Sequence, residues 1–280
     1  MTRRLDRVTV DGIELEYETR GAGEPVVLVH AGIFTGLSLP LLEQPALIER
    51  YRIVHYHRAG CAGSSRVNGP VSVAQEAAHC AALMHQLGID RAHIVGHSNS
   101  ANLALQLALD SPQAVHSLVL IEPAFQHVPS AAKRAKEFLM PAFERYRAGD
   151  KAGAIDAFLR GTCGPNYRPV LDRAVPGAFD RAVADADTFF GQQLPALQAW
   201  SFGAEDARRV TQPVLAVVGE VSRQTDPIWI ERQELLLSWL PQAEPFVLPD
   251  ATHLMQAQNP RGMAEALAAF FARHPLAMPA

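Results

Sequence analysis

The stretch HIVGHSNSANLALQLAL, from His93 to Leu109, predicts a β-strand, a sharp turn and a helix in succession. A β-rich run at 92–95 precedes the turn Gly96-His97-Ser98-Asn99-Ser100, and the alanines and leucines that follow favour a helix. A serine at such a turn needs small residues two positions before and after it, because the flanking backbone lies close to neighbouring strands. Gly96 meets this requirement, and Ser100 stands where glycine is usual but is still small. Ser98 is therefore a candidate nucleophile, although a short match of this kind, taken alone, also occurs in ordinary polar loops.

Composition and charge exclude several classes of protein. The 280 residues are 48% hydrophobic and 19% charged, which is sufficient for one large α/β domain or for a core with a smaller insertion. The formal net charge of −4 gives no electrostatic basis for binding nucleic acid or an anionic membrane. Cys61, Cys80 and Cys163 are far apart without C-x-x-C spacing, so we expect reduced thiols and neither a disulfide nor a zinc site. The N-terminal MTRRLDRVTVDG has no apolar segment, and no run reaches the roughly 18 apolar residues of a membrane span, so we expect a cytoplasmic protein.

The remaining strand signals predict a mainly parallel sheet. Alternating residues around Asp11-Gly12 predict an antiparallel hairpin. Five further runs are rich in β-branched or aromatic residues, as expected of buried strands: 25–29, 51–57, 117–121, 213–219 and 245–248. Helical patterns separate them, including one that begins with a capping box of Ser72 and Gln75. In such a sheet ligands bind at the carboxyl ends of the strands, where the turns at His30, Ser98 and Glu122 fall.

Strand signals vanish between about 124 and 209. Four segments there are helical in character and are separated by breaks containing glycine or proline, namely 133–148, 152–160, 179–190 and 194–202. We therefore expect a helical cap at 124–209, inserted into an α/β core formed by 1–123 and 210–280. The aromatic residues of this region either contact substrate or simply pack the cap. Ile33, Phe125, Phe189 and Trp200 are the residues that we expect to bind substrate.

Taken together, these features resemble the α/β-hydrolase fold superfamily. The resemblance rests on the turn around Ser98, the His30-Ala31-Gly32 turn, the loop from Arg58 to Ser65, the strand from Pro213 to Gly219 and the late Ala251-Thr252-His253. It covers nearly the whole chain and implies a mostly parallel, eight-stranded sheet flanked by helices, with an inserted helical cap. It is much less informative about the substrate.

The resemblance implies a serine nucleophile with a histidine base and an acid. A serine hydroxyl is a poor nucleophile at neutral pH, so it needs a base within hydrogen-bonding reach and a third group that orients this base. We expect Ser98 to be the nucleophile. His253 is expected to be the base, because it lies between the last strand and the final helix, where the family places this residue.

The position of the acid is open. The family commonly carries an aspartate two or three residues after the glycine that ends the strand from Pro213, whereas here Gly219 is followed by Glu220 and, seven residues on, by Asp226. Asp226 precedes Pro227 and is typical of a helix N-cap. Glu122 follows the strand next after Ser98, and some dehalogenases and lactonases that open macrocyclic resorcylic lactones are similar in using a glutamate there. A charge at the end of a buried strand is also costly unless it is paired. We favour Glu122, with Asp226 and Glu220 as alternatives.

The expected oxyanion hole consists of the backbone N–H groups of Asn99 and Gly32. These groups predict a serine hydrolase that cleaves a carboxylic ester or lactone through an acyl-enzyme and requires neither metal nor organic cofactor. The mixed charge of the cap, without a cluster of arginines, favours a small, neutral and largely apolar substrate, with an aromatic ring as one option. Alternatives are a hydrolase of carbon–carbon bonds in β-diketone-like substrates and a slow-turnover ligand sensor. A homodimer is also compatible with the sequence.

Overall fold

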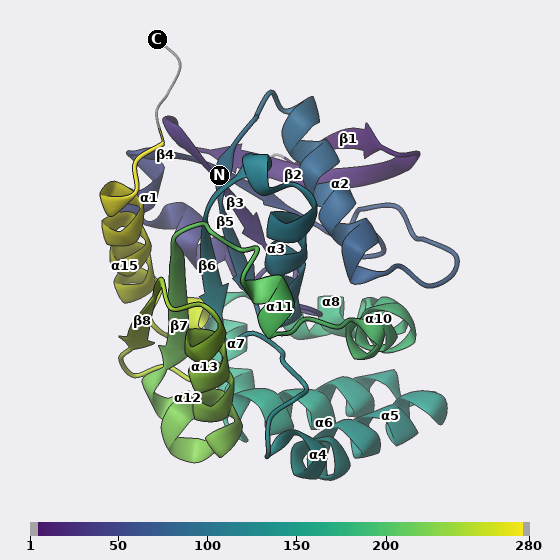
Figure 1. Ribbon diagram of the computed structural model, residues 1–280. Helices are drawn as coiled ribbons and strands as arrows, with labels where there is room; N and C mark the ends of the chain where they lie inside the picture. Colours follow the sequence, from purple (N-terminus) through teal and green to yellow (C-terminus); the bar gives the residue numbers. More distant parts are fainter. Residues whose placement is uncertain (1–4, 277–280) are drawn as a thin grey trace.

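An eight-stranded sheet forms the centre of the computed structural model, which describes residues 5–276 (Figure 1). The strands run in the spatial order β1-β2-β4-β3-β5-β6-β7-β8. The six strands from β3 to β8 are parallel, and β1 and β2 add an antiparallel edge. The strands are β1 (Asp6–Val10), β2 (Ile13–Arg20), β3 (Glu24–Val29), β4 (Tyr51–Tyr56), β5 (Ala92–His97), β6 (Val115–Ile121), β7 (Val214–Gly219) and β8 (Ala243–Leu248). The predicted fold class is confirmed.

Helices cover both faces of the sheet, as the continuous apolar runs of its strands require. On β5, Ile94 packs into a cluster that includes side chains of α2, α3 and α13, whereas Val95 packs on the opposite face among those of α1 and α15. This is the period of two expected of a strand that is buried on both faces. The predicted capping box of Ser72 and Gln75 is present at the start of α2. The core helices are α1 (Pro45–Ile48), α2 (Val73–Gln86), α3 (Asn99–Asp110), α11 (Ala204–Ala207), α12 (Glu220–Thr225), α13 (Pro227–Trp239), α14 (Met255–Gln258) and α15 (Pro260–Arg273).

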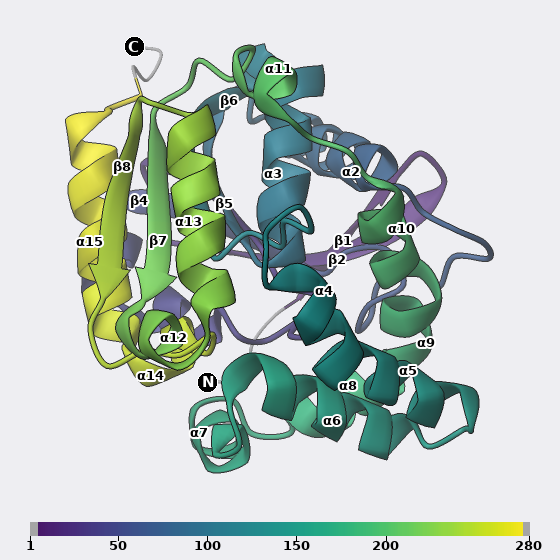
Figure 2. The same cartoon turned by 60° about the horizontal axis from the view of Figure 1, so that its bottom comes forward.

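The chain between β6 and β7 is helical and gathers over the carboxyl ends of the parallel strands (Figures 1 and 2). The sequence pattern missed α7, a short helix with Pro169 in its first turn. Two segments expected as plain α-helix contain π-helical turns, at Ala135–Leu139 and Phe189–Gln193. The α-helices are α4 (Ala131–Arg134), α5 (Met140–Arg147), α6 (Lys151–Cys163), α7 (Tyr167–Ala174), α8 (Ala178–Ala184), α9 (Ala186–Thr188) and α10 (Leu194–Ala199).

Polar contacts join this helical layer, formed by α4 to α10, to the sheet domain. The Asp185 carboxylate accepts a hydrogen bond from the Ala62 backbone N–H at 2.9 Å, and the Thr188 hydroxyl donates to the Gly60 carbonyl at 2.7 Å. On the other side of the layer, Arg134 forms an ion pair with Asp226 at the start of α13. The helical layer is thus held at both sides of the strand ends that it covers.

Two further expectations concern the cysteines and membrane-spanning segments. Cys61, Cys80 and Cys163 are all buried and unpaired. Within residues 5–276, no helix has the length and apolar character needed to cross a membrane.

The packing at the end of β5 leaves no room for a side chain on Gly96. A Cβ atom there would lie 2.3 Å from the Ser100 carbonyl oxygen, which is backbone and cannot move aside. We expect Gly96→Ala to lower the free energy of unfolding by about 1–3 kcal/mol or more, the usual effect of overpacking a tight interior. Urea denaturation measures it. Gly203→Ala is the matched control, because nothing lies within 4 Å of its Cβ position, and an equal loss in both variants would contradict the packing argument.

Candidate active site

Ser98 occupies the sharp turn between β5 and α3. Its backbone has φ 59° and ψ −122°, a conformation that is strained for a residue other than glycine. The Ser98 N–H donates to the Ile121 carbonyl at 2.8 Å, so the parallel ladder with β6 holds the turn in place. Both sequence neighbours of Ser98 are buried, whereas Ser98 itself is only half-buried. The strained turn therefore lifts one serine out of the core.

Ser100, the departure from the usual glycine, has a local function in this turn. Its hydroxyl accepts a hydrogen bond from the His97 N–H at 2.8 Å and has the Val29 and His97 carbonyl oxygens at 2.9 Å as acceptors. The side chain thereby links the turn to the neighbouring strand β3. A small hydroxyl residue fits this position and adds hydrogen bonds that glycine could not make.

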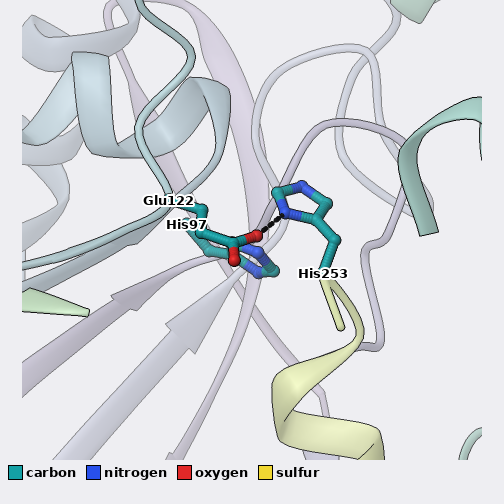
Figure 3. Close-up of side chains that lie close together, drawn as sticks. All are labelled: His97, Glu122 and His253. Atoms are coloured by element: carbon teal, nitrogen blue, oxygen red, sulfur yellow. Dashed lines mark hydrogen bonds and ion pairs between the residues drawn. The ribbon is translucent and has the colours of Figure 1, made fainter. Parts of the chain in front are cut away.

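Glu122 and His253 form a buried hydrogen-bonded pair (Figure 3). His253 Nδ1 lies 2.5 Å from Glu122 Oε2, and each residue is 2% exposed. The second carboxylate oxygen, Oε1, accepts from the Gly219 backbone N–H at 3.0 Å. Because an ionised carboxylate only accepts, Nδ1 carries the hydrogen, and Nε2 is left as the basic nitrogen. Glu122 sits directly after β6 with φ 41°, a second strained turn beside that of Ser98.

Burial controls the protonation of this pair. Loss of solvent raises the pKa of Glu122 to about 7, against the opposing effect of the hydrogen bond from Gly219. Burial also holds the pKa of His253 well below its usual value, assisted by the nearby positive charges of Arg134 and Arg232. The pair therefore takes up one shared proton as the pH falls through about 7.

The two alternative acids have other partners. Asp226 caps α13, accepting from the Ile228 N–H at 3.0 Å, and forms the ion pair with Arg134. The N-cap that the sequence predicts is confirmed. Glu220 lies at the start of α12, a helix that the sequence did not predict, and accepts from the Asp250 N–H at 3.2 Å. Of the three carboxylates, Glu122 is the one that the structure brings to His253.

One of the two backbone donors expected to form the oxyanion hole, the Gly32 N–H, already has a side-chain partner. Asn99 is the first residue of α3, so its own backbone N–H has no partner within the helix. The Gly32 N–H, however, donates to the Asn99 side-chain oxygen at 2.8 Å, and Arg58 reaches the same oxygen at 3.5 Å. The Asn99 side chain thus reaches the Gly32 turn, and in this conformation its amide oxygen takes up the Gly32 donor.

Ser98 and His253 line one pocket beneath the helical layer. Ile33 and Phe189 line it too, as the sequence predicts for substrate contacts. Phe125 and Trp200 are not among its lining residues. Phe125 packs edge-to-face on Trp239 in the core, and the Trp200 indole donates to the Gln106 side chain at 2.8 Å.

Arg134, Trp229 and Arg232 are among the residues of this pocket that the sequence analysis missed. Trp229 stacks on His253 with ring centroids 4.7 Å apart. The two arginines approach the Trp229 ring, with guanidinium carbons 5.0 and 5.5 Å from its centroid. The sequence signal for Trp229 and Arg232 was their spacing of three residues on the predicted helix after Pro227, which puts both on one face.

One group of described residues has the composition of a metal site. His97, Glu122 and His253 each offer a ligand atom, and these atoms lie within 4.8 Å of one another. The bond between Glu122 and His253 already uses one atom of each, and the positive charges of Arg134 and Arg232 act on His253. This environment opposes a cation and suits a hydrogen-bonded proton-transfer pair.

Most of the chain is matched by a known family. A family model described as alpha/beta hydrolase fold matches residues 25–260. The chain belongs to the alpha/beta-hydrolase fold family. The matched segment runs from β3 to the start of α15, so it contains Ser98, Glu122 and His253.

Relatives and solved structures agree with this assignment. The chain is 31% identical over 147 residues to a protein of Azorhizobium caulinodans named as a putative carbamate hydrolase RutD, a match that covers 52% of each chain. It therefore spans about half the length of that curated relative. Two solved structures share the fold at 20% sequence identity and a TM-score of 0.80. They are a thermophilic esterase from Thermogutta terrifontis, covering 98% of this chain and 100% of that one, and the enol-lactonase from Burkholderia xenovorans LB400, covering 95% and 100%.

The pair of Glu122 and His253 predicts how the reactivity of Ser98 depends on pH. Above about pH 7 the pair is in the form with an ionised carboxylate and a basic Nε2, and below it the extra proton occupies the pair. We expect the rate of Ser98 modification by phenylmethanesulfonyl fluoride, followed by intact-mass spectrometry, to fall about tenfold per pH unit below 7. In Glu122→Gln this step should move to lower pH, because burial and the two arginines still lower the pKa of His253 and no carboxylate opposes them. If the rate of Ser98 modification in the unsubstituted protein does not change between about pH 5 and 8, the assignment of Glu122 and His253 as the pair that activates Ser98 is contradicted.

Proposed function

We propose that the protein is a serine hydrolase that cleaves a carboxylic ester or lactone of a small, largely apolar molecule through an acyl-enzyme. The observation that carries the proposal is the buried hydrogen bond of 2.5 Å between His253 and Glu122, with Ser98 on the wall of the same pocket. Membership of the alpha/beta-hydrolase fold family supports hydrolytic chemistry.

In the proposed first step the Ser98 hydroxyl attacks the substrate carbonyl while His253 Nε2 takes its proton. Glu122 keeps the imidazole in the required tautomer and stabilises the positive charge that develops on it. His253 then returns the proton to the leaving alcohol, and a water molecule releases the acid by the reverse sequence. The stacking of Trp229 on His253 limits the movement of the ring during both transfers.

The oxyanion would be stabilised by the backbone N–H groups of Asn99 and Gly32. Because Gly32 donates to the Asn99 side chain, the carbonyl oxygen of the substrate has to displace this amide before it receives both hydrogen bonds. The resting contact gives the Gly32 N–H a hydrogen-bond partner while no substrate is bound. Each donor of this type contributes about 3–4 kcal/mol to stabilisation of the transition state.

The sequence relatives suggest one extension of the substrate range. The same attack on a carbonyl carbon cleaves a carbamate, and the Azorhizobium protein is named as a putative carbamate hydrolase. Aryl carbamates therefore belong in the first substrate panel beside aryl esters and lactones.

The central test compares three substitutions on p-nitrophenyl esters and a lactone. Ser98→Ala and Glu122→Gln should lower kcat by about 10³-fold or more, because each removes a group that acts in the transition state. Asp226→Asn should keep kcat within about tenfold, because Asp226 caps a helix and pairs with Arg134. Circular dichroism checks that all variants are folded.

Two results would count against this assignment. If Asp226→Asn is inactive and Glu122→Gln is active, the acid is Asp226 and Glu122 serves the structure. If the unsubstituted protein hydrolyses none of these substrates, the proposed function fails.

A further inference from the structure

Arg232 is a buried cation on the wall of the candidate active site. It lies on α13, is 8% exposed, and lines the pocket that contains Ser98 and His253. Its Nε donates to the Phe125 carbonyl at 2.8 Å. Across residues 5–276, no carboxylate forms an ion pair with it, and its two Nη groups have no protein acceptor. A guanidinium in this state has up to four N–H donors available for a ligand.

The acidic side chains that act on Arg232 are committed to other partners. Glu122 bonds to His253 and Gly219, and Asp226 pairs with Arg134. Glu231 accepts from the Ser130 hydroxyl at 2.7 Å. Burial, and to a smaller extent the positive charge of Arg134, lower the pKa of Arg232 to about 9. An incoming carboxylate would relieve both of these unfavourable effects.

The surroundings of Arg232 favour one small anion on an apolar body. Most of the remaining pocket lining is apolar or aromatic, including Phe158, Phe189 and Leu197. The guanidinium groups of Arg134 and Arg232 each lie within 6 Å of the centre of the Trp229 ring. Asp226 pairs with Arg134, so the positive charge of Arg232 is the one on this wall that has no direct ion pair among residues 5–276. A single carboxylate matches this charge, whereas a phosphate or a polycarboxylate would bring an excess of negative charge into an apolar site.

We propose that Arg232 binds a carboxylate of the substrate, so that the natural substrate is an ester or lactone bearing one carboxylate on an otherwise apolar skeleton. The proposal rests on the proposed hydrolase function and specifies its substrate class. Arg232 is a binding residue in this scheme, and its planar fork can form two parallel hydrogen bonds to the carboxylate. The bond from Nε to Phe125 fixes the guanidinium beside the exit of β6, the strand that also presents Glu122.

A competing explanation is that Arg232 is only structural. In that case it would hold the Phe125 carbonyl and support the ionised form of Glu122 without contacting substrate. Its replacement would then lower the hydrolysis of all substrates by the same factor. A charge-specific binding residue instead alters the ratio between charged and neutral substrates.

The experiment uses matched aryl esters, 4-acetoxybenzoate and 4-acetoxybenzamide, with the 3-isomers as a second pair. Each kcat/KM is divided by the rate constant for hydrolysis of the same ester by hydroxide, so that differences in the intrinsic reactivity of the two esters are removed. We expect the unsubstituted protein to prefer the carboxylate of at least one pair by about tenfold or more, as a charge-assisted bidentate contact implies. Arg232→Gln should reduce this preference by about tenfold or more, and Arg232→Lys should restore part of it. Arg173→Gln, an exposed arginine on α7, is the matched control and should leave the preference unchanged.

Equal rates on both members of each pair in the unsubstituted protein would overturn the proposal, and so would an equal loss on both members in Arg232→Gln. A direct binding measurement separates this failure from that of the proposed function. Calorimetry on Ser98→Ala should give tighter binding of benzoate than of benzamide, with the difference lost on adding Arg232→Gln. If no ester is hydrolysed but benzoate is bound through Arg232, the hydrolase proposal fails and the anion site stands. If benzoate and benzamide bind equally, the anion site fails.

Discussion

One buried hydrogen bond, from His253 Nδ1 to Glu122, is the contact on which the rest of this site depends. It joins the end of β6 to the loop after β8, across 131 residues of chain. Both groups are removed from water, so either one alone would be a costly buried polar group. The strained backbone of Glu122, the hydrogen bond from Gly219 and the stacked Trp229 all hold this pair in position. Ser98, lifted out of the core by its strained turn, lines the same pocket as His253 and is the group on which the pair acts in the proposed mechanism.

Much of this arrangement could be predicted from the sequence, because the signals are local. Buried parallel strands carry continuous apolar runs, so β3 and β5 to β7 are visible without knowledge of their neighbours. The turn around Ser98 needs small residues at fixed spacing, and Gly96 is visible for that reason. Glu122 stood out because a carboxylate at the end of a buried strand needs a partner. Asp226 before Pro227 gave an N-cap signal, and the structure confirms the cap.

The contacts that escaped prediction join residues distant in the chain. Nothing near Asn99 indicates that its side chain accepts from Gly32, because the two lie 67 residues apart and meet only when β3 and β5 pair. Arg134 and Arg232 likewise come from the helical layer and from α13, and neither belongs to a cluster of arginines in the sequence. The expectation of a wholly neutral substrate followed from this absence of a cluster, and our proposal for Arg232 revises it. The short helices α7 and α12 were missed because a helix of this length depends on tertiary packing more than on its own propensity.

The most direct test of the central contact is proton NMR of the His253 Nδ1–H. A hydrogen shared in a short bond between an imidazole and a carboxylate is strongly deshielded, and burial slows its exchange with water. We expect a resonance far downfield of the backbone amides above about pH 7, absent in His253→Gln, moved upfield in Glu122→Gln and unchanged in Asp226→Asn. A resonance that persists in Glu122→Gln and is lost in Asp226→Asn would contradict the pairing of His253 with Glu122, because the partner of His253 would then be Asp226.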